Sequence, residues 1–558
     1  MNSVNRLFFW LGPVIIVAAA ALLLWQPYLH TRIYEDFNYH LLVAQNFERA
    51  GGPVGWAFWE SYPEGRPQNY PPLLHLLLVP LVKTGIDPYL LTLYVPPFFV
   101  ALALSLAWIG LKLLFDARTA LFYLLISIGF ERHFTQLGVT IPSSLVLAAS
   151  PLLLYLVKND RRIAAALLSA LMLYTHMIMP YLVMASLFAW AVIDRRHIKT
   201  AALSIGGALL LYLPWGINLF LNRKYVKYLD PVYQAAKRAD YLTLPLLCYL
   251  FFLAAFAYFF FRARKEKTRT AGWFFVLLFI AQTPMLFYKF PGRFTVAGGF
   301  FAGAIVAAYV LGLIWRNRPD AHALKAAIIL FLLAGQYATL VLTVPLAADA
   351  PAILFWQRGA LIQAQALSER GITDLSYPYQ PHNLNIAKTI RENTAPDDMI
   401  YTASRFFNLG LHSKETRHSI GDFFAALSGR AKADPRLPEA YWLPEPPLEK
   451  LKIVIADYHE TNLFPGKRET HPNPELAAKL EQHFDLLHQE DRLAVFINKS
   501  NETLKVQPSK PAINQWAAWL AIVGAATAVA RETRAASREK QDQAASPEPR
   551  TERKRILS

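Results

Sequence analysis

The sequence contains a succession of long apolar segments that carry almost no charge, and this feature restricts the possible folds most strongly. The first segment runs from Leu7 to Trp25, others follow as far as residue 346, and the last covers residues 514–530. Apolar runs of about 18 or more residues are typical of transmembrane helices. Because the runs continue along the chain, a secretory signal followed by a soluble protein is excluded. The sequence therefore predicts a polytopic α-helical membrane protein.

The excess of basic residues predicts how the chain crosses the membrane. The formal net charge of +16 would suggest nucleic acid in a soluble protein, but membrane proteins concentrate Lys and Arg in cytoplasmic loops. We therefore expect no nucleic-acid partner. Basic clusters lie at 115–118, 158–162, 194–199, 262–269 and 316–318, and beyond residue 530. We place all of these clusters on the cytoplasmic side. After the first span at Leu7–Trp25, further spans are then expected near residues 91–114, 119–131, 142–157, 162–177, 180–193, 200–220, 241–261, 272–288, 295–315, 323–346 and 514–530.

The segment "PPLLHLLLVPLVKTG" (71–85) decides the parity of this topology. If it crossed the membrane, every later basic loop would move outside. The segment contains His75 and three prolines and is short for a span, so we interpret it as a lateral or re-entrant helix. Roughly 12 transmembrane helices remain. Residues 27–90, 131–144, 222–240 and 288–293 are then expected outside.

Four parts follow from this topology. They are a transmembrane domain at 1–346 with its first outer loop at 27–90, a small extracytoplasmic α/β domain at 347–513, a transmembrane helix at 514–530, and a disordered cytoplasmic tail at 531–558. Within 347–513, segments 384–393 and 474–484 have helical patterns, while "MIYTA", "LKIVIADY" and "LAVFINK" have strand patterns. The single cysteine, Cys248, excludes an intramolecular disulfide and a cysteine-based metal site.

The stretch "YEDFNYHLLVAQNFERAGG" (34–52) lies just beyond the first apolar run. It has the pattern of an amphipathic helix, with Phe37, Leu41 and Phe47 close to one face. Asp36 and His40 are four residues apart and therefore share a helical face. An ionised carboxylate at headgroup level is also compatible with a solvated loop or a helix cap, so the position alone does not define a function.

The order of motifs around this stretch resembles a known family. "FNYH", a Gly-rich turn, "YPEGRP" and "NYPPLLH" resemble the first outer loop of the oligosaccharyltransferase catalytic subunit, and more broadly the GT-C glycosyltransferases. The resemblance covers roughly residues 30–80 and implies a GT-C-like fold and a polyprenyl-phosphate-linked sugar donor. The family's catalytic first-loop aspartate corresponds to Asp36. Two departures argue against transfer to Asn in a sequon, since the next outer loop has only Glu131 as an acid and no W-W-D-Y-G motif occurs within 347–513.

The residues of the outer loops suit the chemistry that the resemblance implies. Transfer requires a base for the acceptor hydroxyl, for which we choose Asp36, with Glu35 as an alternative. His40 either orients Asp36, binds phosphate, or has only an interfacial role. Glu131 completes a divalent-metal site with Asp36, for Mg or Mn, if a metal is required.

Positive charge is required for the departing lipid phosphate. Arg223 and Lys224 belong to a loop that the topology places outside, and Lys289 and Arg293 flank a turn at the outer end of a span. We predict that these four residues bind substrate. The alternatives are contacts with lipid headgroups and snorkelling at the interface.

The sequence therefore predicts an inverting membrane glycosyltransferase that moves a sugar from a polyprenyl-phosphate donor to a glycan, lipid or protein acceptor. We expect it in a prokaryotic plasma membrane, with the active site and the soluble domain facing away from the cytoplasm. Two alternatives remain open at this stage. One is a transporter or flippase of lipid-linked glycans, which would bury ionisable residues mid-span. The other is a non-catalytic protein of envelope assembly, in which Asp36 would be dispensable.

Overall fold

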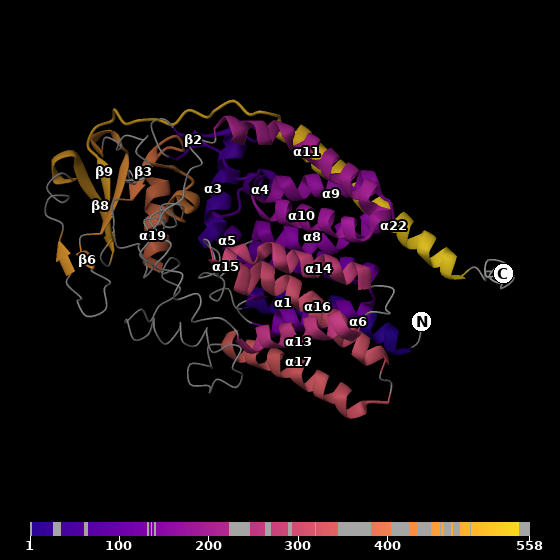
Figure 1. Ribbon diagram of the computed structural model, residues 1–558. Helices are drawn as coiled ribbons and strands as arrows, with labels where there is room; N and C mark the ends of the chain where they lie inside the picture. Colours follow the sequence, from indigo (N-terminus) through magenta and orange to yellow (C-terminus); the bar gives the residue numbers. More distant parts are fainter. Residues whose placement is uncertain are drawn as a thin grey trace, which may run out of the picture.

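The computed structural model describes residues 3–25, 35–60, 65–130, 133–134, 137–138, 141–222, 246–262, 269–287, 293–317, 320–343, 381–402, 423–433, 448–457, 459–461, 470–472, 480–490 and 493–545. Most of these residues are helical, and the helices form a bundle with a sheet-containing part at one end (Figure 1). The start of α1 and the end of α22 lie at the opposite end of the bundle (Figure 1).

A helix occupies each apolar segment for which the sequence predicts a span. These helices are α1 (Ser3–Trp25), α5 (Pro88–Leu114), α6 (Ala117–Gly129), α8 (Ile141–Lys158), α9 (Arg162–Thr175), α10 (Met179–Ile193), α11 (Ile198–Leu221), α13 (Leu246–Arg262), α14 (Arg269–Gln282), α16 (Gly299–Asn317), α17 (His322–Thr343) and α22 (Gln515–Ala545). Short helical turns join some of them, namely η1 (Arg195–His197), α15 (Pro284–Phe287) and the π-helix η4 (Arg293–Gly298).

Five helical segments among the described residues are long and apolar enough to cross a membrane. They are Leu7–Leu24, Pro88–Leu114, Ile141–Lys158, Arg195–Leu221 and Gly299–Asn317. The other apolar helices are shorter, so the count of roughly 12 spans stays a prediction.

Two helices of the bundle begin with an aspartate cap. The Asp87 carboxylate accepts a hydrogen bond from the backbone N–H of Tyr89 at 2.8 Å, and Asp116 accepts one from the backbone N–H of Thr119 at 2.7 Å. Such caps satisfy backbone donors that the first helical turn leaves free. Each cap therefore fixes the residue at which α5 or α6 begins.

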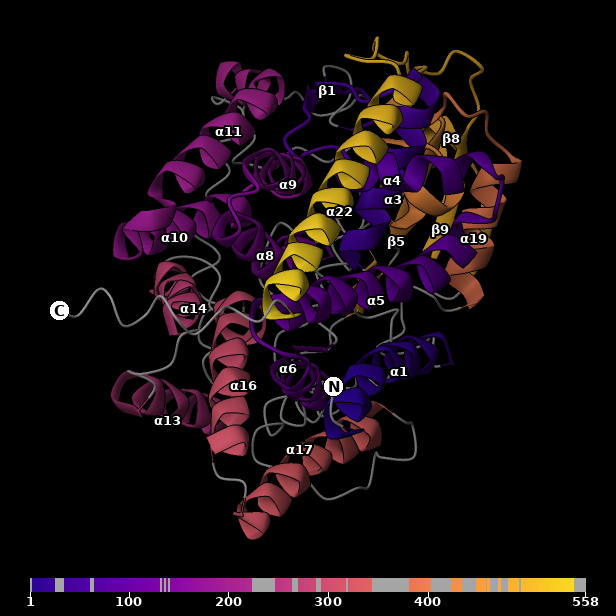
Figure 2. The same cartoon turned by 90° about the vertical axis from the view of Figure 1, so that its right-hand side faces the viewer.

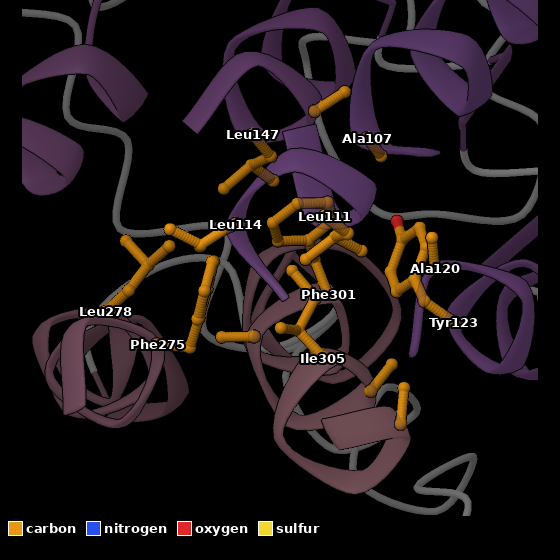
Figure 3. Packing of buried hydrophobic residues seen from close by; sticks show 14 of the residues in the cluster. Ala107, Leu111, Leu114, Ala120, Tyr123, Leu147, Phe275, Leu278, Phe301 and Ile305 are labelled. Atoms are coloured by element: carbon orange, nitrogen blue, oxygen red, sulfur yellow. The ribbon is translucent and has the colours of Figure 1, made fainter. Parts of the chain in front are cut away.

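The core of the bundle lies where α5, α8 and α16 meet (Figure 3). Leu111 of α5, Leu147 of α8 and Phe301 of α16 are buried there together. Helix α5 approaches α8 closely because Gly110 has no side chain, since a Cβ at this position would lie only 2.7 Å from the backbone nitrogen of Leu152. A larger residue at Gly110 would force these two helices apart.

A five-stranded mixed sheet forms the centre of the part beyond the bundle. Its strands are β3 (Met399–Thr402), β4 (Ala431–Ala433), β5 (Ile453–Asp457), β8 (Phe484–Glu490) and β9 (Leu493–Asn498), in the order β4-β3-β5-β9-β8. Strands β4, β3 and β5 are parallel, while β5, β9 and β8 are antiparallel neighbours. Around it lie α19 (Pro381–Glu392), the short helix η8 (Leu448–Lys450) and the hairpin of β6 (His459–Thr461) with β7 (Thr470–Pro472).

The structure differs from the sequence-based expectation where β8 begins. The helical pattern at 474–484 extends to Phe484, but Phe484 pairs with Asn498 as the first residue of β8. Strand β9 pairs with β5 along one edge, and β8 provides partners for its other edge. Backbone pairing with β9 therefore outweighs the local helical pattern at this position.

The first outer segment lies between the bundle and the sheet (Figure 1). It consists of α3 (Glu35–Ala50), a two-stranded hairpin of β1 (Trp56–Ala57) and β2 (Arg66–Pro67), and α4 (Leu73–Lys83). At 1.5 Å per residue, α4 is about 16 Å long, which is roughly half the thickness of a hydrocarbon core. This length agrees with the interpretation of 71–85 as a helix that does not cross.

The first outer segment and the sheet share one hydrophobic core. Phe47 of α3 and Leu74 of α4 belong to the same buried cluster as Phe424 and Ile455. Backbone and side-chain polar groups join the two parts as well, because Gln45 Nε2 donates to the carbonyl oxygen of Ala426 at 2.8 Å. The first loop and the sheet are therefore one packed unit, although most of the chain lies between them.

The C-terminal helix corrects the prediction of a disordered tail at 531–558. Helix α22 continues to Ala545, so residues 531–545 are helical, while 546–558 lie outside the described residues. Arg161, at the start of α9, forms ion pairs with Glu532 and Glu539 of α22. Figure 2 shows α22 running along the bundle between α9 and α4. These contacts hold the polar end of the helix, which the sequence pattern alone did not indicate.

Candidate active site

Helix α3 places the predicted catalytic residues at the end of the bundle that faces the sheet. Phe37, Leu41 and Phe47 are buried as the sequence pattern predicts, but Asn38 and Asn46 on other faces of α3 are buried as well. Asp36 and Glu35 form the first turn of α3, and their side chains lie outside the described part of the structure. The backbone thus places Asp36 one helical turn before His40, as the four-residue spacing requires.

His40 is almost completely buried and is hydrogen-bonded to a second histidine. Its Nδ1 lies 2.9 Å from Nε2 of His75 on α4, and the two residues are 3% and 0% exposed. Burial lowers the pKa of His40 to about 3. Burial, and secondarily the neighbouring His40, holds the pKa of His75 well below its usual range. Both imidazoles are therefore neutral at physiological pH, which disfavours His40 as a cationic phosphate ligand.

Aromatic rings surround the histidine pair. The ring of Tyr70 lies edge-on, with its centroid 5.0 Å from that of His40 and 5.9 Å from that of His75. Phe47 packs edge-on at 5.6 Å from His75. The ring of His176, between α9 and α10, lies 6.0 Å from Tyr70. This wall of rings keeps water away from the hydrogen bond and explains why both histidines are neutral.

The side chain of His176 has a separate structural role. Its Nδ1 accepts hydrogen bonds from the backbone N–H groups of Ile178 and Met179, at 3.0 and 3.1 Å. Met179 is the first residue of α10 and Ile178 directly precedes it, so His176 satisfies donors at the start of that helix. This observation gives His176 a structural role at the junction of α9 and α10.

A buried ion cluster connects the first outer segment to the sheet. Glu60 is 1% exposed and lies 2.9 Å from the guanidinium of Arg66 and 3.8 Å from the ammonium of Lys432 on β4. Arg66 also donates to the hydroxyl of Tyr39 at 3.5 Å. A charge network therefore runs from the sheet to the residue that precedes His40 on α3. Sequence patterns do not reveal it, because Glu60 and Lys432 are far apart along the chain.

The second outer turn meets the segment that contains Arg293. His133 and Ser144 line a small cavity together with Ala297 of η4 and Phe301 of α16. The π-helix η4 begins at Arg293, whose side chain is not described. π-helical turns occur frequently at functional sites. His133 and Ser144 therefore lie close to Ala297, near the end of η4.

Several predicted site residues lie outside the described residues. They are Glu131, Arg223, Lys224 and Lys289. Within the described part of the chain, no group of three or more His, Cys, Asp or Glu side chains is arranged to hold a metal ion. The predicted metal pair, Asp36 and Glu131, involves no described side chain and stays a prediction.

Comparisons with known proteins identify the fold. No protein-family model matches the sequence, and no curated protein matches it. A crystal structure of ArnT from Cupriavidus metallidurans bound to undecaprenyl phosphate is similar over 88% of this chain and 98% of that one, with 13% identity and a TM-score of 0.51. The apo structure of the same protein gives 14% identity, the same coverage and the same TM-score.

The archaeal oligosaccharyltransferase AglB from Archaeoglobus fulgidus, in complex with an inhibitory peptide and a dolichol-phosphate, covers 80% of this chain and 69% of its own, at 14% identity and a TM-score of 0.48. That score is too low to establish a shared fold. The similarity to ArnT does establish a shared fold with that protein over most of both chains.

Proposed function

We propose that this protein is an inverting membrane glycosyltransferase that takes a sugar from a polyprenyl-phosphate-linked donor. The acceptor is a glycan, a lipid or a protein, and transfer occurs on the extracytoplasmic side of a prokaryotic plasma membrane. The proposal includes roughly 12 transmembrane helices and an outer α/β domain at 347–513. The solved complex of ArnT with undecaprenyl phosphate, which shares this fold, supports a lipid phosphate as the donor group.

The observation that carries the proposal is the meeting of outer segments at one end of the bundle. Ile141, at the start of α8, belongs to the same buried cluster as α3 and α4. The turn before α8 shares a cavity with Ala297 of η4. Helix α3, the start of α8 and η4 are therefore linked through shared contacts, which supports a site built by Asp36, Glu131 and Arg293. This is the arrangement that a site needs if a base and cations act on one bound donor.

In this site we assign proton acceptance to Asp36, with Glu35 as the alternative. The acceptor hydroxyl loses its proton to the carboxylate as its oxygen attacks the anomeric carbon, and the bond to the lipid phosphate breaks. Arg293, Lys289, Arg223 and Lys224 supply positive charge for the departing phosphate. A divalent cation, if bound by Asp36 and Glu131, would neutralise further negative charge on that phosphate.

Sugar transfer by the Asp36→Asn variant tests this function. The purified protein in lipid nanodiscs receives radiolabelled glucosyl, mannosyl and N-acetylglucosaminyl undecaprenyl phosphate, with envelope fractions as acceptor. Asn keeps the size of the side chain but cannot accept the proton, so transfer should fall by roughly 10²–10⁴-fold while donor binding persists. Glu48→Gln removes an acid from the same helix outside the proposed site and should leave transfer unchanged.

The outcomes of this experiment separate the possible roles of Asp36. If Asp36 only caps α3, Asn serves equally well and transfer stays near the wild-type rate, which overturns the catalytic assignment. If Asp36 binds a metal, donor binding falls as well, and a chelator abolishes wild-type transfer. Absence of transfer from every donor by the wild-type protein would contradict the proposed function.

A further inference from the structure

The hydrogen bond between His40 and His75 has an asymmetric environment. Nδ1 of His75 is completely buried and has no hydrogen-bond partner among the described residues. His40 Nε2, by contrast, is not completely buried. It is therefore the outer end of the pair. The pair therefore has one closed end, at His75 on α4, and one open end, at His40, which follows Asp36 by one turn of α3.

This asymmetry favours one tautomer of the neutral pair. If His40 Nδ1 carried the proton of the shared bond, His75 would need its own proton on Nδ1, where a buried N–H would have no acceptor. Buried N–H groups without an acceptor are rarer in proteins than buried acceptors without a donor. In the other tautomer, His75 Nε2–H donates to His40 Nδ1, and His75 Nδ1 carries only a lone pair. The N–H group of His40 is then at Nε2, the open end of the pair.

We propose that His75 is a positioning residue that fixes His40 as a neutral hydrogen-bond donor, leaving its Nε2–H available for an anionic oxygen in the active site. The oxygen belongs either to the Asp36 carboxylate or to the phosphate of the donor lipid. A neutral donor suits either oxygen, because it orients the group without neutralising its charge. This inference rests on the proposed function.

The tautomer can be measured without any activity. Nitrogen NMR of the full-length protein in nanodiscs, labelled with ¹⁵N-histidine, distinguishes protonated from bare ring nitrogens, and spectra of His40→Gln and His75→Gln assign the signals. We expect a bare Nδ1 and a protonated Nε2 for His40, and the reverse for His75. A protonated His40 Nδ1, or a metal ion between the rings, overturns the proposal whether or not the protein transfers sugar.

Substitutions at position 75 test whether the hydrogen bond matters for transfer. Gln places its amide near the position of Nε2 and can still reach His40, whereas Asn is too short and Phe has no nitrogen. We expect His75→Gln to keep transfer within about threefold of wild type, and His75→Asn and His75→Phe to lose about tenfold, equivalent to one hydrogen bond. Equal losses in all three variants would indicate packing alone and overturn the positioning role.

The kinetic constants identify the anionic oxygen. If His40 orients Asp36, His75→Phe lowers kcat with little change in the donor KM. If His40 contacts the phosphate, the donor KM rises as well. Phe47→Leu is the matched control, because Phe47 packs against His75 without a hydrogen bond. This variant should lower the melting temperature while leaving the ¹⁵N signals of His40 unchanged.

Discussion

At the residue scale, the two buried histidines make the stability of the protein depend on pH. Burial lowers the pKa of His40 to about 3 and depresses that of His75 as well, whereas both titrate near 6.5 in the unfolded chain. Between these values the unfolded state binds more protons, so the free energy of unfolding decreases as the pH falls below 6.5. Above that pH the contribution of both rings is fully present.

We predict a loss of about 1.4 kcal/mol per buried histidine between pH 7.5 and 5.5. Denaturant titration in detergent should therefore show a pH dependence that is weaker by about this amount in His75→Gln than in the wild-type protein. The control is the same titration between pH 8.5 and 7.5, where the two proteins should respond alike. An identical response of both proteins between pH 7.5 and 5.5 would show that His75 is not a buried neutral ring.

The sequence predicts some of these residues and not others. The spacing of Asp36 and His40 indicates that they share a face of α3, because periodicity within one helix is local information. It does not predict that His75 is the partner of His40, since the two are 35 positions apart and meet only when α3 packs on α4. Similarly, no local pattern connects Glu60 with Lys432, although both are almost completely buried.

At the scale of elements, the helices of the bundle follow the apolar segments closely, because a membrane-spanning helix must satisfy its backbone groups internally and be apolar along its length. Prediction fails where contacts between elements decide the structure. Helix α22 extends beyond the predicted end at residue 530 because Arg161 pairs with Glu532 and Glu539. The polar composition of 531–545 is typical of a disordered tail, and the sequence pattern does not indicate that Arg161 lies beside this segment.

We predict that Arg161→Ala loosens the end of α22. Hydrogen exchange of residues 531–545 should become faster, while the melting temperature changes little, because exposed ion pairs contribute only about 0.2–1 kcal/mol each. Arg162→Ala is the matched control, since Arg162 is an exposed neighbour with no ion pair to α22 among the described residues. Unchanged exchange in Arg161→Ala would mean that this helix end is stable by itself.

At the scale of the whole molecule, the shared core of the first outer segment and the sheet requires both to face the same side of the membrane. The proposed topology adds that this side is the outer one. In a chain with Cys248 replaced by Ser, single cysteines at Thr84 and Asp485, both exposed, should react with a membrane-impermeant maleimide added to intact cells. A cysteine at Arg195, exposed in a basic loop, should react only after the cells are opened.

The labelling pattern distinguishes two kinds of failure. Reaction of Arg195→Cys in intact cells, with none at the other two positions, would invert the whole topology. Reaction at only one of Thr84→Cys and Asp485→Cys would contradict the shared core itself.

The packing of α3 against the sheet also has a consequence for the order in which the protein is made. Gln45 and Ala426, which are hydrogen-bonded, are separated by 381 positions along the chain. At about 5–20 residues per second, the ribosome needs roughly 20–75 s to synthesise the partner of a helix that has already left it. During that interval the apolar face of α3 has no sheet to cover it. The newly made first loop therefore has to remain at the membrane surface or on a chaperone at least until the chain has been synthesised as far as Ala426.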